Sequence, residues 1–345
     1  MVKSNFLKVV LGIIASAIIV YILKTLKTIF IPLTFAIFLS FIFAPLNRFL
    51  IKKKIPTSLI LLIMVIIILI TFTLSGTIVY TSVSSFVTEF PKYEEKMTIL
   101  IQDFITKFEI PVEEVKNYLN NKVNWVEIAD KLSFTKVISA TMGNFIDFFI
   151  KLLLTVVFML FIVLERNKLF HRVEKVITEK DVLHSLKVIA KIEGQVRKYL
   201  VNKTFISLAT ALISMLFIYA YGIDFVIIAG LLIFILNFIP NIGSIIASAF
   251  PMIICFFQFG LSWQLIAVVI TLPSIQMTFG NVIEPRLMGT GLNLSPIIIL
   301  ISLIFWYWIW GPVGMILAIP ITSALNLIFK EIDSMKIVSA FISGD

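Results

Sequence analysis

The chain has 345 residues, 59% of them apolar, with a formal net charge of +9 at pH 7 and a mean hydropathy of +1.05. One soluble core cannot bury so much apolar surface, so lipid must be the solvent for most of the chain. One cysteine and two histidines exclude an intrachain disulfide framework and a cysteine-built metal site, and the positive charges follow short loops beside apolar runs, which argues against nucleic-acid binding.

Residues 1–83 predict three transmembrane spans. The apolar runs are Val9–Leu23, Ile29–Leu46 and Leu59–Val83, and the third is ample for a hydrocarbon core of ~30 Å. Between the second and third runs lies the strongest positive cluster of any short loop, formed by Arg48, Lys52, Lys53 and Lys54. The positive-inside rule places this loop and the N-terminus in the cytoplasm.

Two polar segments follow, separated by a fourth predicted span at residues 145–164. Residues 84–144 hold seven lysines against nine acids, and we expect Pro91 and Pro111 to break this extracytoplasmic domain into short helices. Residues 165–203 hold ten Lys or Arg against five acids. Their apolar stripe is consistent with a basic amphipathic helix that lies on the cytoplasmic membrane surface, and it consists of Leu186, Ile189, Val196 and Leu200.

Residues 204–330 form a membrane half whose helices are interrupted by glycine and proline. Thr204–Tyr221 and Trp263–Gly280 predict ordinary crossings. The remaining apolar runs are short and form two pairs: Phe225–Ile239 with Ile245–Phe257, and Pro296–Trp310 with Pro312–Phe329. Each pair is either a hairpin that enters and leaves the membrane on one side or two thin crossings. An even number of segments keeps residues 331–345 as a cytoplasmic tail.

These elements predict an all-α polytopic transmembrane bundle of about eight spans, made of six full crossings and two broken helix pairs. One helical insert is extracytoplasmic and one is cytoplasmic. The expected location is the cytoplasmic membrane of a prokaryote, with both termini in the cytoplasm.

The first candidate site is the break Asn237-Phe238-Ile239-Pro240-Asn241-Ile242-Gly243. Proline removes a backbone donor and glycine permits unusual dihedral angles, so the helix should break there. The amides of Asn237 and Asn241 would then offer neutral ligands to a cation or a polar solute. The alternative is a plain surface loop between two helices.

The second candidate site is Glu284-Pro285-Arg286, followed by Gly289, Asn293 and Ser295. Between Thr204 and Phe329, 126 residues contain only three charged side chains, namely Asp224, Glu284 and Arg286. A charge at bilayer depth costs roughly 2.5–3.5 kcal/mol on insertion scales, so it is retained where it is paired, interfacial or beside water. Glu284 could carry a proton, and Arg286 could contact a solute or a gate. The alternative is a salt bridge that holds a cytoplasmic loop.

Asp224 is most simply an interfacial helix cap, with a transport role as the second interpretation. No paired carboxylates, no nucleophile with a base and no metal cluster occur in the apolar half, so we expect neither an enzyme nor a bound metal or cofactor. No P-loop motif is present, so an ion or solute gradient, or a separate subunit, would have to drive transport.

At these residues the chain resembles the AI-2E family of transporters. The resemblance rests on Asn237-Phe238-Ile239-Pro240 with Gly243, on Pro285-Arg286-Leu287-Met288-Gly289 with Leu292, Leu294, Ser295 and Pro296, and on Gly311 to Pro320. Asn241 and Ser244 stand where the family often has an aromatic residue and a proline. The resemblance implies about eight spans, no nucleotide, transport of small solutes and a homo-oligomer.

Three functions remain open at this point. The first is a secondary transporter that exports a small polar organic solute such as autoinducer-2, with one side of its path formed by Asn237, Pro240, Asn241 and Gly243 and the other by Glu284, Pro285, Arg286 and Gly289. Asp224, Asn293 and Ser295 are possible secondary contacts. The second is a sodium(lithium)/proton antiporter, and the third is a non-transporting membrane scaffold, for example in sporulation. The expected partners are the lipid bilayer, the solute, and H⁺ or Na⁺.

Overall fold

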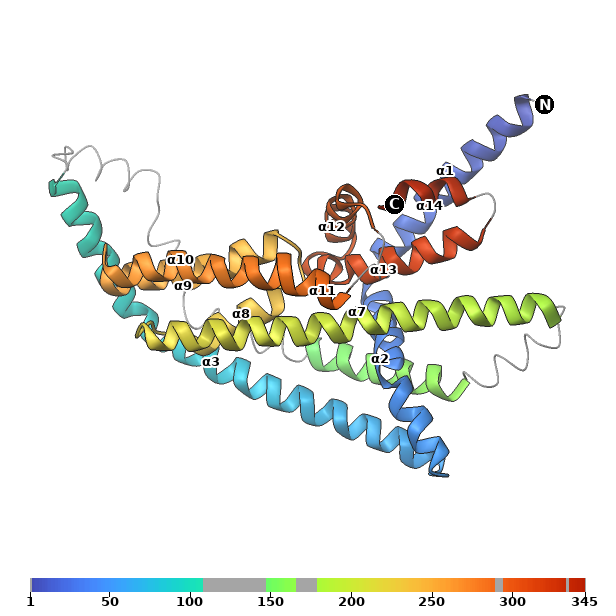
Figure 1. Ribbon diagram of the computed structural model, residues 1–345, viewed down its shortest axis with the longest axis horizontal. Coiled ribbons are helices and arrows are strands. Elements are labelled where there is room, and N and C mark those ends of the chain that lie inside the picture. The colour runs from blue at the N-terminus through green and yellow to red at the C-terminus, as the bar shows by residue number, and fades with distance from the viewer. Residues whose placement is uncertain (1, 108–146, 166–178, 289–293, 333–334, 345) are drawn as a thin grey trace. The chain divides into compact units, whose positions relative to one another are not determined.

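Every regular element in the part of the chain that the structure describes is a helix. The structure is a computed structural model, and it describes residues 2–107, 147–165, 179–288, 294–332 and 335–344 (Figure 1). Within that part, seven helices are long and apolar enough to cross a membrane, and three apolar helices are shorter. The all-α polytopic fold predicted from the sequence is therefore confirmed.

The chain divides into two compact units. Unit 1 contains Met1–Ile66, Lys151–Thr204 and Arg286–Asp345, and unit 2 contains Ile67–Ile150 and Phe205–Pro285. Helices α3 (Thr57–Lys107) and α7 (Glu179–Ala220) each contribute residues to both units.

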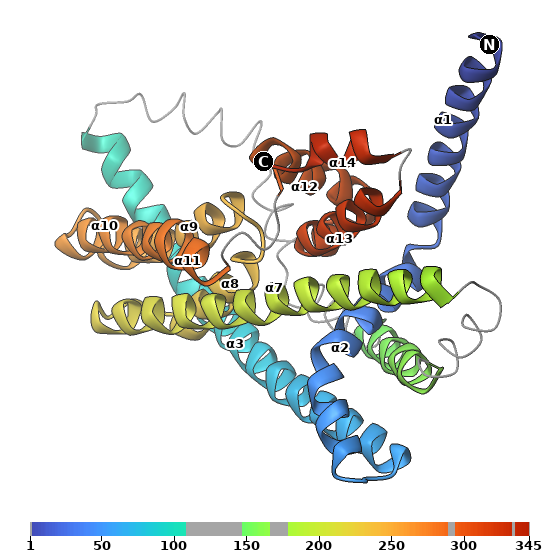
Figure 2. The same ribbon diagram turned by 45° about the vertical axis from the view of Figure 1, so that its right-hand side comes forward.

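Unit 1 includes the first two helices and the last three: α1 (Val2–Thr25), α2 (Lys27–Lys52), α12 (Pro296–Trp310), α13 (Pro312–Glu331) and α14 (Lys336–Ile342). The end of α1 meets the end of α12, because Trp310 Nε1 donates to the Leu23 carbonyl at 3.0 Å and Lys24 Nζ lies 3.9 Å from the centre of the Trp308 ring. Helices α12, α13 and α14 lie together in both ribbon views (Figures 1 and 2).

Unit 2 is built around an apolar core shared by the second half of α7 and by α8 (Val226–Leu236), α9 (Ile242–Phe259) and α10 (Trp263–Met277). A π-helical segment, η1 (Thr278–Ile283), and the short α11 (Glu284–Met288) continue from α10. The core consists of small and branched apolar side chains, which include Ala211, Ile218, Ala229, Ile233, Ala247, Ile254, Val268 and Leu272.

Helices α8 and α9 form an antiparallel pair joined by a tight turn. The backbone N–H of Asp224 donates to Gln258 Oε1 at 3.0 Å, and Gln258 Nε2 donates to the Gly222 carbonyl at 2.9 Å, so the start of α8 is tied to the end of α9. At ~1.5 Å per residue, the 11 residues of α8 extend only ~16 Å. That length is about half of a ~30 Å hydrocarbon core.

Helices α12 and α13 form a second hairpin, with its turn at Gly311 (φ 68°). Its open end is closed by α14, because Ser295 N donates to the Ile342 carbonyl at 3.0 Å and Ser339 Oγ donates to Asn326 Oδ1 at 2.7 Å. The residues after Glu331 are therefore not a free tail where the structure describes them. The sequence left re-entrant hairpins and thin crossings open for both pairs. Helices α9 and α13 are each long and apolar enough to cross a membrane, so both interpretations stay predictions.

The expected break at Pro91 is wrong. Helix α3 contains the third predicted span, within the candidate span Thr57–Phe86, and continues without interruption through Pro91 to Lys107. Two residues after that proline, Tyr93 packs within unit 2, because its hydroxyl donates to Asp224 Oδ2 and its ring lies 5.5 Å from the Phe225 ring. Such tertiary contacts override the local preference of proline. Pro111 lies outside the described residues.

Helix α7 runs without a break from Glu179 to Ala220, so the basic segment and the following span share one helix. Within its first half, Glu193, Val196 and Tyr199 are buried. The basic segment is therefore not a separate helix. Within the predicted apolar stripe Val196 is buried and Ile189 is 44% exposed, and the position of this segment at the membrane surface stays a prediction.

Candidate functional site

The break between α8 and α9 exposes a polar side chain at a strained backbone turn. Asn241 has φ 60° and ψ −59°, and the N–H of Ile242 donates to the Pro240 carbonyl at 2.7 Å across it. These values describe a γ-turn with positive φ, which is rare and costs energy. The Asn241 side chain is exposed and makes no hydrogen bond to the residues that the structure describes. Its amide can thus donate to and accept from a solute.

Asn237 anchors this turn to α7. Its side chain is 5% exposed, and Nδ2 donates to Ser207 Oγ at 3.2 Å. Ser207 is fully buried, so the pair is shielded from the surroundings. A buried hydrogen bond of this kind fixes the end of α8 because each group would be costly to leave unpaired.

Gly243 allows α9 to start directly against the last turn of α8. A Cβ atom at this position would lie 1.8 Å from the Leu236 carbonyl oxygen and 3.2 Å from Ile239 Cβ. No side chain fits there without movement of the backbone. Pro240 and Gly243 therefore have structural roles in shaping the turn, while Asn237 anchors it and Asn241 presents its amide outward.

Further polar groups of unit 2 are buried without a partner among the described residues. They are Ser82 Oγ on α3, Ser214 Oγ on α7, Ser248 Oγ on α9 and Gln276 Nε2 on α10. Buried polar atoms normally have a hydrogen-bond partner, so these groups are suited to hold water or a polar solute. None of them was predicted from the sequence. A sequence pattern could have pointed to Ser214, because Ser207, Thr210 and Ser214 recur at helical spacing within an apolar span and so lie on one face of α7.

The Glu-Pro-Arg segment is helical rather than a turn between spans. Glu284 begins α11 directly after the π-helical segment, and its N–H donates to the Phe279 carbonyl, five residues earlier. Pro285 has no N–H, so it cannot donate to the preceding turn. Single turns of π-helix occur frequently at functional sites.

Within α11, Glu284 is half-buried and Arg286 is exposed. Residues two apart on a helix do not face each other, so the spacing does not favour a mutual salt bridge. The side chain of Asn237 bonds to Ser207 on α7 and not to a residue of α11. This hydrogen bond therefore does not connect the first candidate site with the second. Gly289 and Asn293 lie outside the described residues. Ser295 immediately precedes α12, where its N–H is bonded to Ile342.

Asp224 does not cap α8. The residue preceding that helix is Phe225, with φ 60°, and no side chain caps the helix. The Asp224 carboxylate instead accepts a hydrogen bond from the Tyr93 hydroxyl on α3. Burial of Tyr93, and then its bond to Asp224, raise the pKa of its hydroxyl, so it remains a donor at neutral pH.

Comparisons with known proteins agree on one family. The family model described as AI-2E family transporter matches residues 9–334. The AI-2 transport protein TqsA of Escherichia coli is 28% identical over 347 residues, covering 99% of this chain and 97% of that protein. A putative transport protein of Haemophilus influenzae is 30% identical, covering 95% of this chain and 93% of the relative. One from Borreliella burgdorferi is 28% identical, covering 93% and 86% respectively.

Proposed function

The chain belongs to the AI-2E family of transport proteins, and from that premise we propose that it exports a small polar organic solute, driven by an ion gradient. Autoinducer-2 is the first solute to test, because one relative is named as an AI-2 transport protein. The direction of transport, the coupling ion and the solute belong to this proposal. So do the location in the cytoplasmic membrane of a prokaryote, the cytoplasmic termini and a homo-oligomeric assembly.

The observation that carries the proposal is the turn between α8 and α9. The first helix of this pair extends only ~16 Å, about half of a ~30 Å core, so we place the turn that follows it within the membrane. Exposed polar backbone at that depth occurs where it lines a wet cavity or is buried in protein. The strained turn, the exposed Asn241 amide and the half-buried Pro240 support a solute contact there.

Glu284 and Arg286 have complementary roles in the proposed cycle. Glu284 is the one acidic residue in the candidate span Trp263–Met288, so it would carry a proton as the solute moves. Arg286, exposed on α11, would contact a polar or anionic solute or a gate. Asp224, bonded to Tyr93, would hold the base of the hairpin in place rather than bind the solute. Gly289, Asn293 and Ser295 would complete the segment between α11 and α12.

The proposal is tested by efflux from proteoliposomes. Vesicles that contain the purified protein are loaded with isotope-labelled autoinducer-2, and its release is followed under an imposed pH or sodium gradient. We expect saturable efflux that is faster than from empty vesicles and that depends on one of the gradients. Efflux equal to that of empty vesicles under both gradients, with correctly inserted protein, would refute autoinducer-2 export.

Sodium(lithium)/proton antiport is the second candidate, favoured by the half-buried position of Glu284 beside a π-helical segment. It predicts movement of protons when Na⁺ or Li⁺ is added, with no organic solute present. Export alone predicts none. No observation of the molecule favours the scaffold alternative.

A further inference from the structure

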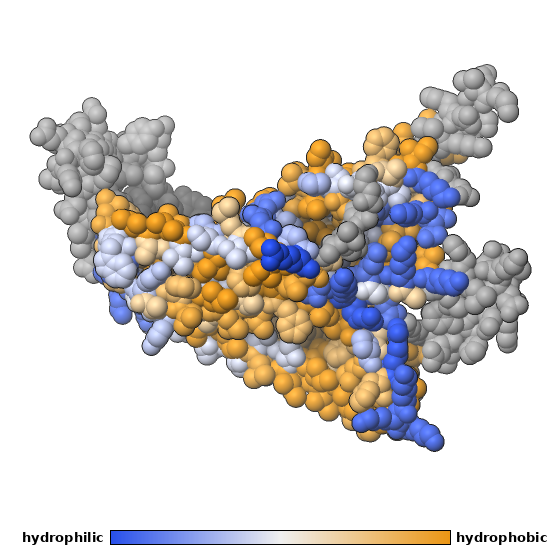
Figure 3. Space-filling model, in the orientation of Figure 1, coloured by the Kyte–Doolittle hydropathy of each residue, from blue (hydrophilic) through white to orange (hydrophobic). Residues whose placement is uncertain are grey.

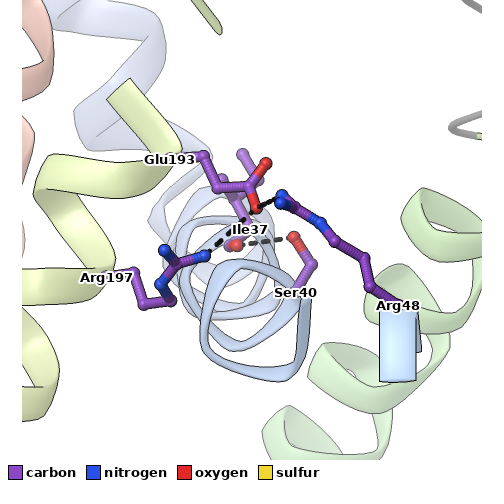
Figure 4. A network of polar contacts seen from close by, with 5 residues as sticks. All are labelled: Ile37, Ser40, Arg48, Glu193 and Arg197. Atoms are coloured by element: carbon purple, nitrogen blue, oxygen red, sulfur yellow. Dashed lines mark hydrogen bonds and ion pairs between the residues drawn. The ribbon is translucent and has the colours of Figure 1, made fainter. Parts of the chain in front are cut away.

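Unit 1 contains a buried carboxylate between two arginines. Glu193 on α7 is 2% exposed, and its Oε1 lies 2.6 Å from Arg48 Nη2 and 3.5 Å from Arg197 Nη1 (Figure 4). Arg48 comes from the end of α2, and the contact joins residues 145 positions apart in the sequence. A buried charge is costly unless it is paired, so Glu193 fixes where the guanidinium groups lie.

The two arginines retain unused capacity to bind an anion. The Arg48 side chain is 59% exposed and that of Arg197 is 31% exposed. Each guanidinium has five N–H donors, and the recorded ion pairs use one nitrogen of each. The single negative charge of Glu193 also balances only one of the two positive charges of Arg48 and Arg197. The planar donor fork of arginine matches the geometry of phosphate.

Six lysines extend this positive surface: Lys52, Lys53 and Lys54 after Arg48, and Lys187, Lys191 and Lys198 on α7. All six are exposed, and the described part of the chain pairs none of them with an acid. In the space-filling view, hydrophilic residues form a strip that borders apolar surface (Figure 3). Such clusters next to membrane spans attract anionic headgroups.

Apolar side chains stand beside these charges. Phe49 is 53% exposed and Ile51 is 48% exposed, and Lys53 Nζ lies 4.6 Å from the centre of the Phe49 ring. Alternation of exposed apolar and basic residues at the end of a span is typical of the boundary between acyl chains and headgroups. A soluble anion would gain nothing from the exposed Phe49 and Ile51, whereas a phospholipid would cover them.

We propose that Arg48 and Arg197, held in place by Glu193, bind the phosphate of an anionic phospholipid headgroup. The surrounding lysines strengthen the attraction, and Phe49 and Ile51 contact the acyl chains. This role goes beyond the topology signal of the same charges, which would orient the chain in the membrane without a defined site. It does not depend on what the protein transports.

Native mass spectrometry of the full-length, delipidated protein in detergent tests the site. Phosphatidylglycerol and phosphatidylcholine are titrated separately, and the apparent dissociation constants are compared. We expect phosphatidylglycerol to bind more tightly. R48Q/R197Q should weaken its binding by about tenfold or more, because charge-assisted hydrogen bonds to the phosphate are lost. Higher salt should reduce the preference.

Two further variants make the result decisive. R48Q/R197Q leaves Glu193 without its arginines, so R48Q/E193Q/R197Q provides a version without the buried carboxylate at position 193, for which the same loss is expected. K330Q removes an exposed positive charge at the end of α13 and should leave binding unchanged. Equal binding of the two lipids, undiminished binding by the triple variant, or complete competition by free glycerol phosphate would each overturn the proposal.

Discussion

Replacement of Gly243 by alanine tests whether the α8–α9 hairpin requires its close backbone contact. The new Cβ would lie 1.8 Å from the Leu236 carbonyl oxygen, whereas non-bonded heavy atoms pack at about 3.5 Å. The overlap of roughly 1.7 Å involves backbone, which cannot rotate away as a side chain can. Overpacking costs about 1–3 kcal/mol, and we expect the upper end, about 3 kcal/mol.

The assay is thermal unfolding in detergent, followed by tryptophan fluorescence. At about 2 °C per kcal/mol, Gly243→Ala should lower the Tm by about 6 °C. Gly76→Ala is the matched control, because Gly76 lies in α3 and a Cβ there meets nothing within 4 Å. Its Tm should stay the same or rise, since alanine favours helix over glycine. A Gly243→Ala protein that melts within about 1 °C of the wild type would refute the close-packed hairpin.

Two other variants separate proton coupling from local stability. If Glu284 carries the proton, Glu284→Gln should abolish any Na⁺- or Li⁺-dependent pH change in liposomes with a trapped pH dye, and an unaltered signal would contradict this role. The pKa of Tyr93 is raised in the folded protein, so the stability that its hydroxyl contributes is complete below about pH 10 and is lost at higher pH. Between about pH 9 and 11, the Tm of the wild type should therefore fall more steeply than that of Tyr93→Phe, and parallel curves would contradict the Tyr93–Asp224 contact.

Local sequence signals located the helix breaks well. Proline at the first position and glycine after the last predicted both bounds of α12, and the same chemistry marked the turn between α8 and α9. At these places the backbone groups alone decide where a helix can continue. The residues of the first candidate site were therefore available from the sequence.

Contacts between residues far apart in the chain could not be predicted from local sequence signals. Glu193 looked like one acid in a basic segment, and its pairing with Arg48 depends on how α2 and α7 pack. Similarly, the continuation of α3 through Pro91 is supported by the contacts of Tyr93 with Asp224 and Phe225. Propensity and periodicity describe neighbours along the chain, so contacts between distant segments escape them.

The most direct measurement of the central proposal is the concentration dependence of labelled autoinducer-2 flux in proteoliposomes, for wild type and Asn241→Gly. Glycine accepts positive φ without strain, so this variant removes the exposed amide while preserving the turn. Loss of one hydrogen bond to the solute should raise the KM by about three- to tenfold with the protein still folded. Saturable flux with an unchanged KM would contradict a solute contact at the turn between α8 and α9.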